Sequence, residues 1–284
     1  MTLESLDSIK TTCQSEYGTL KKVIVCKPSF MAINEIINDC QLKYIDENIK
    51  TELALKQHHN FVETMRSHGV DVITLPSFEK FPEQVFTRDI GFILGYQTFV
   101  SEMANEIRKG EELVLEKWLN TNNVSYHNIS SHPIEGGDVI IDGSIVYVGL
   151  SDRTCEEAIV KLQKALPDHQ IVPIPFNPKY LHLDCVFNVL SPTDALIFPQ
   201  ALNPALVKSL AGRYNLIEVN KEEQFTMGTN VLSIGNKKVF SQPLNKRVNE
   251  KMRALGYDVL EVDFSEIIKS GGAFRCCTMP LERG

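Results

Sequence analysis

The sequence lacks the long apolar run of roughly 18–20 residues that a membrane-spanning helix needs. It also lacks a basic run of about five or more residues, and its formal net charge is −7. We therefore expect neither nucleic acid nor a membrane as a partner. The first residues, from Met1 to Asp7, carry neither the basic nor the apolar region of a signal peptide, so no secretory leader is expected.

Closely spaced cysteine pairs are also missing. The chain of 284 residues contains seven cysteines, an odd number, with no CxxC or CxxH spacing. This pattern indicates free thiols in a reducing cytoplasm rather than a disulfide framework. Glycine and proline are spread evenly, and no low-complexity stretch or linker interrupts the chain. We expect a single domain over residues 1–284.

What the sequence does contain is an internal repeat. Two strands, a helix and a third strand follow one another four times, with turn residues between the first two strands of each unit. The predicted helices cover residues 111–119, 154–166, 205–214 and 245–255, and the strands after them cover 125–129, 170–175, 215–219 and 258–262. At the start of the second helix, Thr154-Cys155-Glu156-Glu157 predicts a capping box.

A fifth unit is split between the two ends of the chain. A strand at residues 20–26, a long helix at 47–68 and a strand at 70–75 lack one partner strand, which we assign to residues 274–279. Five ββαβ modules of about 45–50 residues would then close into a pseudo-symmetric α/β ring, a five-bladed propeller. Such a ring has no internal domain boundary.

Polar clusters recur where the first strand of each module begins. They are Thr87-Arg88-Asp89, Glu135-Gly136-Gly137-Asp138, His182-Leu183-Asp184, Gly228-Thr229-Asn230 and the stretch from Gly272 to Cys276. Equivalent positions of a pseudo-symmetric ring lie at the same end of its axis. We therefore expect these groups to meet in one site.

Cys276 is the candidate nucleophile of that site. It follows Gly271-Gly272, a double glycine that lets the backbone pass close to a ligand. A free thiol with a pKa of about 8.5 is only a few per cent ionised at pH 7, so it needs a cation or a proton acceptor nearby. His182 is the best candidate, because Asp184 follows on the expected strand face and Glu135 can orient the imidazole. Several carboxylates around one pocket suit a guanidinium, which offers five donors in a planar fork.

Each cluster taken alone also has a structural interpretation. Asp89 can cap a turn, and residues 135–138 can form a tight turn before a strand. Cysteines such as Cys155 can be packed in the core as small apolar residues. A zinc site built from Cys276, His182 and the carboxylates is a further alternative, although the closely spaced ligand pair of structural zinc sites is missing.

Together, the motifs resemble those of the guanidino-group-modifying enzymes of the pentein fold, which include dimethylarginine dimethylaminohydrolases, arginine deiminases and amidinotransferases. The resemblance runs from about residue 16 to the C-terminus and rests on FTRD, EGGD, HLD and the glycine-led terminal cysteine. It implies that Cys276 attacks the guanidinium carbon and that Cys277 is a bystander, because Thr278 stands two residues after the nucleophile. It also implies that His182 acts as general acid and then general base, with Glu135 beside it.

The resemblance further implies which residues bind the substrate. Asp89 and Asp184 would hold the guanidinium, and Asp138 is expected at the same site. Arg108 and Arg153 fall where the dimethylarginine hydrolases bind the α-carboxylate of their substrate. No cofactor and no metal is implied. Asp184 favours a guanidinium with free N–H groups, because a dimethylated nitrogen has no hydrogen to donate.

We therefore expect a hydrolase of arginine or an N-substituted (methylated) arginine. It would work through a covalent thiouronium on the cysteine and give citrulline with ammonia or an alkylamine. Two alternatives stay open: an amidinotransferase that passes the amidino group to an amine, and a non-catalytic binding protein on the same fold. The expected partner is a small guanidino compound, and the oligomeric state is left open, a homodimer included.

Overall fold

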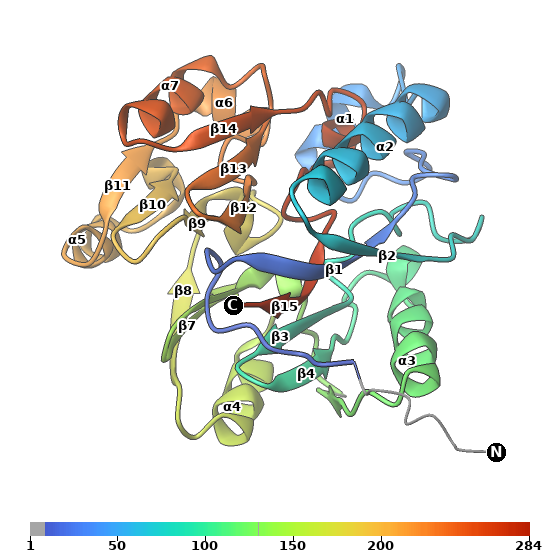
Figure 1. The fold of residues 1–284 in the computed structure, drawn as a ribbon, viewed down its shortest axis with the longest axis horizontal. Helices are drawn as coiled ribbons and strands as arrows, with labels where there is room; N and C mark the ends of the chain where they lie inside the picture. Colours follow the sequence, from blue (N-terminus) through green and yellow to red (C-terminus); the bar gives the residue numbers. More distant parts are fainter. Residues whose placement is uncertain (1–8, 130) are drawn as a thin grey trace.

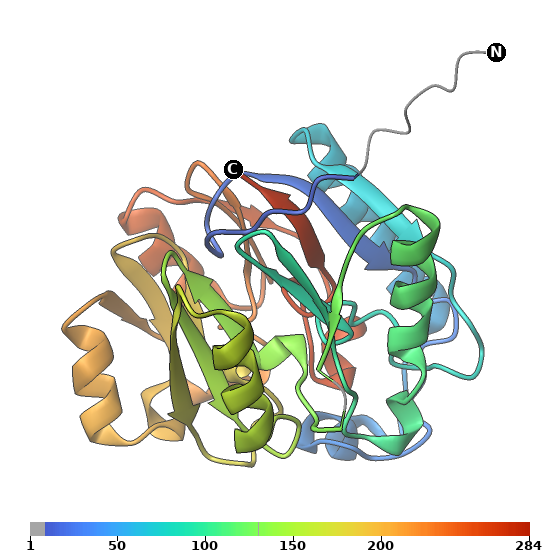
Figure 2. The same cartoon turned by 90° about the horizontal axis from the view of Figure 1, so that it is seen from below.

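The computed structural model describes residues 9–129 and 131–284, in which the strands form five three-stranded sheets. Each sheet joins two antiparallel strands and adds a third strand in parallel after a helical crossover. Figure 1 shows the sheets arranged around a common centre with the helices on the outside, and Figure 2 shows the same arrangement from below. The chain thus forms an α/β ring.

The modules combine the following elements. The split module contains β15 (Met279–Arg283), β1 (Leu20–Cys26) and β2 (Asp71–Leu75), with α1 (Asp39–Tyr44) and α2 (Thr51–Ser67). The second contains β3 (Gly91–Leu94), β4 (Gln97–Val100) and β5 (His127–Asn128), with α3 (Glu111–Thr121). The third contains β6 (Val139–Asp142), β7 (Ile145–Leu150) and β8 (Gln170–Pro175), with α4 (Glu156–Ala165). The fourth contains β9 (Phe187–Val189), β10 (Asp194–Ile197) and β11 (Asn215–Glu218), with α5 (Pro204–Ala211). The fifth contains α6 (Lys221–Phe225), β12 (Leu232–Gly235), β13 (Lys238–Ser241) and β14 (Asp258–Glu261), with α7 (Lys246–Ala254).

Burial increases from the third strand of a module to its first strand. The first strands β3, β6, β9 and β12 are buried along their whole length, whereas β2, β8 and β11 expose several side chains. Neighbouring sheets contact each other through β15 and β3, β6 and β9, and β1 and β12. A strand that is covered on both faces buries its side chains on both faces. This is why the first strands show no alternation of buried and exposed residues. The loops that precede them therefore open toward the interior.

The helices are amphipathic and cover the outside of the ring. The longest, α2, spans 17 residues and buries Phe61 and Met65 against the core while its other face meets solvent. Phe61 packs edge-on against Phe264 at 5.1 Å and against Phe274 at 5.3 Å between ring centroids, so the helix contacts the chain segment just before Cys276. In the described part of the chain, no helix has both the length and the apolarity to cross a membrane.

The structure confirms the split module but corrects its closing strand. We expected that strand at residues 274–279, whereas β15 begins at Met279 and pairs antiparallel with β1. Residues 274–278 turn instead, because the Cys277 N–H donates to Ala273 O and the Thr278 N–H donates to Arg275 O. The helices α1 and α6 were not expected from the sequence.

The predicted capping box at the start of α4 is wrong. The residue that caps α4 is Cys155, and its side chain makes no capping hydrogen bond. The hydroxyl of Thr154 accepts the backbone N–H of Glu135 at 3.2 Å instead. The start of α4 is therefore tied to the EGGD segment of the same module.

Candidate active site

Five of the predicted site residues lie in the loops before first strands and are brought together inside the ring. Asp89, Glu135, His182, Asp184 and Cys276 are each at most 2% exposed. We expected two of them on one strand face, and this is wrong. His182 precedes a short 3-10 helix, Leu183–Cys185, and Asp184 lies within it. The turn, rather than the strand, directs both side chains to the site.

His182 lies between two carboxylates. Its Nε2 is hydrogen-bonded to Glu135 Oε2 at 2.8 Å, and its Nδ1 lies 3.7 Å from Asp89 Oδ1. Within residues 9–129 and 131–284, neither Nδ1 of His182 nor Oδ1 of Asp89 has a hydrogen-bond partner. Two buried polar atoms that face each other beyond bonding distance mark a place for a ligand or a water molecule.

The EGGD glycines make this arrangement possible. A Cβ on Gly137 would lie 2.7 Å from the His182 ring and 2.8 Å from Asp89 Oδ1. A Cβ on Gly136 would lie 2.1 Å from Arg88 O. Any side chain at either position would therefore displace the site.

The charges of Glu135 and His182 support each other. Burial alone would raise the pKa of Glu135, but the hydrogen bond and charge of His182, with Arg108 and Arg153, hold it well below its usual range. Burial alone would lower the pKa of His182, but Asp89 and Glu135 raise it above its usual range. The surrounding carboxylates thus favour the protonated form of His182, whose Nδ1 faces Asp89 Oδ1 across 3.7 Å.

The sulfur of Cys276 is held by Asn230 and Asp184. Asn230 Nδ2 donates to Sγ at 3.0 Å, and the thiol donates to Asp184 Oδ2 at 3.5 Å. Asn230 Oδ1 accepts the backbone N–H groups of Ala273 and Cys276, each at 3.1 Å, which fixes the loop. Gly271 begins this loop with φ of 91°, a left-handed conformation that favours glycine. Burial, Asp184 and Asp89 raise the pKa of the Cys276 thiol well above its usual value.

Asp184 has a partner that the sequence analysis missed. Arg275 NH1 donates to Asp184 Oδ2 at 2.7 Å, and Arg275 NH2 donates to Glu16 Oε1 at 3.1 Å. Arg275 is 1% exposed, so this guanidinium is an internal part of the fold. Its position next to Cys276 is the only signal that the sequence offers, and it does not show which way the side chain turns.

Arg108 has other partners than those expected. We predicted that it would bind a substrate carboxylate, but it is 2% exposed and donates through NH1 to Asp89 Oδ2 at 2.7 Å. Its NH2 donates to Glu111 Oε2 at 2.8 Å and to Phe86 O at 3.3 Å. Two carboxylates of the protein thus hold the guanidinium, because the turn before α3 directs it inward. The structure gives Arg108 the position of a residue that fixes Asp89.

Arg153 keeps a free donor. Its NH2 donates to Ile37 O at 3.2 Å, whereas its NH1 lies 3.8 Å from Glu135 Oε1 and has no hydrogen-bond partner among the described residues. Arg153 lines a cavity of about 400 Å³. The Ala104 N–H, in the same wall, donates to Glu135 Oε1 at 3.1 Å, so the cavity adjoins the site.

Asp138 lies behind the site and does not face the ligand position. Its Oδ1 accepts the Leu183 N–H at 2.8 Å and its Oδ2 accepts the Ser151 hydroxyl at 2.6 Å. Burial, opposed by the charge of His182, raises its pKa to about 6. We expected a substrate contact, and the geometry instead gives Asp138 the place of a brace between the loop of His182 and the loop of Arg153.

Two groups of potential metal ligands occur among the described residues. One is Asp89, Glu135 and His182, whose donor atoms lie within 4.8 Å of one another inside the site. In this group the His182 Nε2 is already bound to Glu135. The other group lies outside the site, at the start of α4.

Comparisons with known proteins agree with this architecture. Residues 27–283 match the family described as N,N dimethylarginine dimethylhydrolase, eukaryotic. The chain is 54% identical over 275 residues to the uncharacterised protein YkgA of Bacillus subtilis. The alignment covers 97% of this chain and 96% of YkgA. It is 25% identical over 264 residues to the N(G),N(G)-dimethylarginine dimethylaminohydrolase of Mycobacterium tuberculosis, with 92% and 86% of the two chains covered.

A solved structure shows the same fold. The N-terminal domain of ArgZ, an arginine dihydrolase from cyanobacteria, superposes with a TM-score of 0.85 over 92% of this chain and 97% of that domain. The two sequences are 23% identical, so this likeness concerns the fold alone. The chain belongs to the N,N dimethylarginine dimethylhydrolase family and, with it, to the guanidino-modifying enzymes of the pentein fold.

Proposed function

We propose that this protein hydrolyses the guanidino group of arginine or of an N-substituted (methylated) arginine, with Cys276 as the nucleophile. The observation that carries the proposal is the meeting of Cys276, the His182–Glu135 pair, Asp89 and Asp184 in one buried place. The proposed reaction requires a nucleophile that attacks a cationic carbon, carboxylates that bind the cation and an acid that protonates the departing amine. The thiol, the carboxylates and the imidazolium supply these three groups.

The carboxylates provide the binding site for the cation. Asp89 Oδ1 has no partner within the described residues and faces the His182 Nδ1 across 3.7 Å. A substrate N–H that donates to Asp89 would place its nitrogen next to that imidazolium. Asp184 contacts the Cys276 thiol, so a guanidinium held by both aspartates would have its carbon close to the sulfur.

The raised pKa of the Cys276 thiol fits a nucleophile that is activated by its substrate. Burial and the neighbouring carboxylates favour the neutral thiol in the free protein. A bound guanidinium adds a positive charge beside the sulfur, which favours the thiolate. The thiol proton passes to Asp184, which already accepts its hydrogen bond.

The chemistry then follows in two steps. Sulfur bonds to the guanidinium carbon, and His182 gives its Nδ1 proton to the departing nitrogen, which leaves as ammonia or an amine while a thiouronium remains. Water then adds its oxygen to the same carbon while His182 takes one of its protons. The carbon–sulfur bond then breaks, Asp184 returns its proton to the sulfur, and the remaining hydroxyl proton of the adduct passes to the released ammonia or amine as the ureido product forms. General acid–base assistance of this kind accelerates a reaction by about 10²–10⁴-fold.

Of the two predicted arginines, we propose that one contacts the substrate and that the other positions a carboxylate of the site. Arg153 lines the cavity, and its NH1 has no hydrogen-bond partner among the described residues; both observations support a role in binding the α-carboxylate of an amino-acid substrate. Arg108 instead holds Asp89 in place through its 2.7 Å ion pair. We also propose that residues 1–284 act as one catalytic domain. The seven free cysteines support a reducing compartment as its location.

A product assay tests this function. Purified protein is incubated with arginine, methylated arginines, agmatine or simple guanidines, and the ureido product and the released amine are measured together. With arginine or a methylated arginine, we expect equal amounts of citrulline and of ammonia or amine, and neither product with Cys276→Ser. Release of ornithine or a related amine only when glycine or another acceptor amine is added would indicate an amidinotransferase. No product with any guanidino compound would contradict the proposal.

A further inference from the structure

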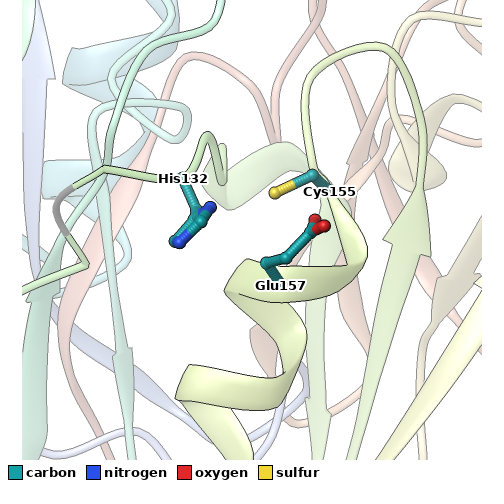
Figure 3. A group of neighbouring side chains, drawn as sticks. All are labelled: His132, Cys155 and Glu157. Carbon is teal, nitrogen blue, oxygen red and sulfur yellow. The ribbon is translucent and has the colours of Figure 1, made fainter.

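A second group of reactive side chains lies at the start of α4. His132, Cys155 and Glu157 place a ring nitrogen, a sulfur and a carboxylate oxygen within 4.8 Å of one another. Figure 3 shows the three side chains pointing toward a common space, with the sulfur of Cys155 between the imidazole and the carboxylate. His132 and Cys155 are half-buried and Glu157 is exposed, so an ion could reach them from solvent.

Two of the three side chains are already in contact, because the Cys155 side chain hydrogen-bonds to the Glu157 carboxylate. Cys155 and Glu157 are the N-cap and second residue of α4, so their relative position is fixed by the helix. His132 lies in the loop before Glu135. This loop is attached to the start of α4 by a hydrogen bond from the Cys155 N–H to Pro133 O at 3.1 Å.

The donor set selects the kind of ion. Thiolate, imidazole and carboxylate are zinc ligands, whereas calcium and magnesium prefer oxygen ligands alone. Tetrahedral zinc with bonds of about 2.0–2.3 Å spaces its donors about 3.5 Å apart, so small side-chain rotations would close the present arrangement. Three protein ligands leave a fourth position, and the exposed side of Glu157 leaves that position to water.

We propose that His132, Cys155 and Glu157 form a zinc site that fastens the loop before Glu135 to the segment that carries Arg153. His132 lies three residues before Glu135, and Cys155 lies two residues after Arg153. These two segments are already joined by the hydrogen bond from the Glu135 N–H to the Thr154 hydroxyl and by the 3.8 Å ion pair between Arg153 NH1 and Glu135 Oε1. Zinc binding releases the thiol proton to solvent and involves no change of oxidation state. The binding itself does not depend on the proposed catalytic function.

Cobalt(II) titration of the full, chelator-treated protein tests the site, because a thiolate bound to cobalt gives a near-ultraviolet charge-transfer band. We expect a band that saturates at one cobalt per chain and that added zinc removes. The band should be lost in Cys155→Ser and should persist in Cys276→Ser, the matched control that removes the active-site thiol. His132→Asn and Glu157→Gln should weaken cobalt binding by about tenfold or more.

A thermal melt with and without zinc gives a second measurement, which distinguishes loss of zinc binding from misfolding of the variant. Wild type should melt at a higher temperature with zinc, and Cys155→Ser should melt near the metal-free wild type in both conditions. A band that disappears only in Cys276→Ser would overturn the proposal, since the metal would then lie at the active site. Absence of a thiolate band from wild type would overturn it as well.

Discussion

The pairing of Glu135 with His182 leads to a prediction that separates a catalytic acid from a buried structural histidine. The two side chains are both fully buried, with 2.8 Å between Oε2 and Nε2. Burial lowers the pKa of His182, while Asp89 and then the Glu135 hydrogen bond raise it above its usual range. Glu135→Gln removes one of these charges and keeps the size and hydrogen-bonding reach of the side chain.

The magnitude follows from the hydrogen bond. A hydrogen bond to a charged group contributes about 1.5–3 kcal/mol. At about 1.4 kcal/mol per pH unit, its loss should lower the pKa of the His182 imidazolium by about 1–2 pH units. Because the proposed acid must carry its proton in the free enzyme, the alkaline limb of the kcat/KM profile should move down by the same amount.

Two assays check this prediction. Imidazole NMR titrations of Cys276→Ser, with and without Glu135→Gln, follow His182 in the absence of turnover. Kinetics of the single Glu135→Gln variant give the pH profile. His58 is the matched control, because burial and Lys27 lower its pKa to about 3 and nothing connects it to Glu135 among the described contacts. An unchanged alkaline limb, together with a shifted His182 titration, would refute His182 as the general acid.

Two further variants test other parts of the site, and a third tests Glu83, a buried carboxyl that accepts hydrogen bonds from Gln41 and Ser270. Arg153→Ala should reduce kcat/KM for arginine about ten- to a hundredfold and spare agmatine, and equal losses on both substrates would indicate a structural arginine. Wild type should prefer arginine or monomethylarginine to asymmetric dimethylarginine by at least about tenfold in kcat/KM, and Asp184→Asn should reduce this preference. The same substitution removes the ion pair with Arg275, so the variant should also melt at a lower temperature. Burial, opposed by Arg108, raises the pKa of Glu83 to about 7, so its contribution to stability is complete below pH 4.5 and is lost as the pH rises through 7. Glu83→Gln should therefore be more stable relative to wild type at pH 8 than at pH 5 in urea unfolding, and a pH-independent difference would contradict this.

The repeat in the sequence predicts the fold because each module repeats the same local signals. The strand at residues 20–26 and the parallel strand at 170–175 agree with β1 and β8. The sequence predicts the closing strand five residues early, since Phe274, Cys276 and Cys277 are apolar, as residues of a buried strand are. They are buried because the loop passes through the core, and periodicity alone does not distinguish these two cases.

The sequence could predict that the candidate site residues lie close together, but it could not predict their contacts. The recurrence of polar clusters before the first strands predicts that Cys276 and His182 meet. Residue type does not show that Arg108 turns inward to Asp89 or that Arg275 pairs with Asp184. Arginine has a long side chain, and its direction depends on packing that only the assembled ring supplies. The spacing of His132 from Cys155, 23 positions apart, likewise gives no signal before the loops come together.

The most direct test of the account is to trap the covalent intermediate on Cys276. The protein is mixed with arginine or a methylated arginine, quenched in acid within one turnover and digested for mass spectrometry. The peptide with residues 276–277 should gain the mass of the substrate less the departing ammonia or amine, and fragmentation should place the gain on Cys276. Cys277→Ala should still form the adduct, and Cys276→Ser should not. Turnover without any adduct, or an adduct on Cys277, would contradict the proposed nucleophile.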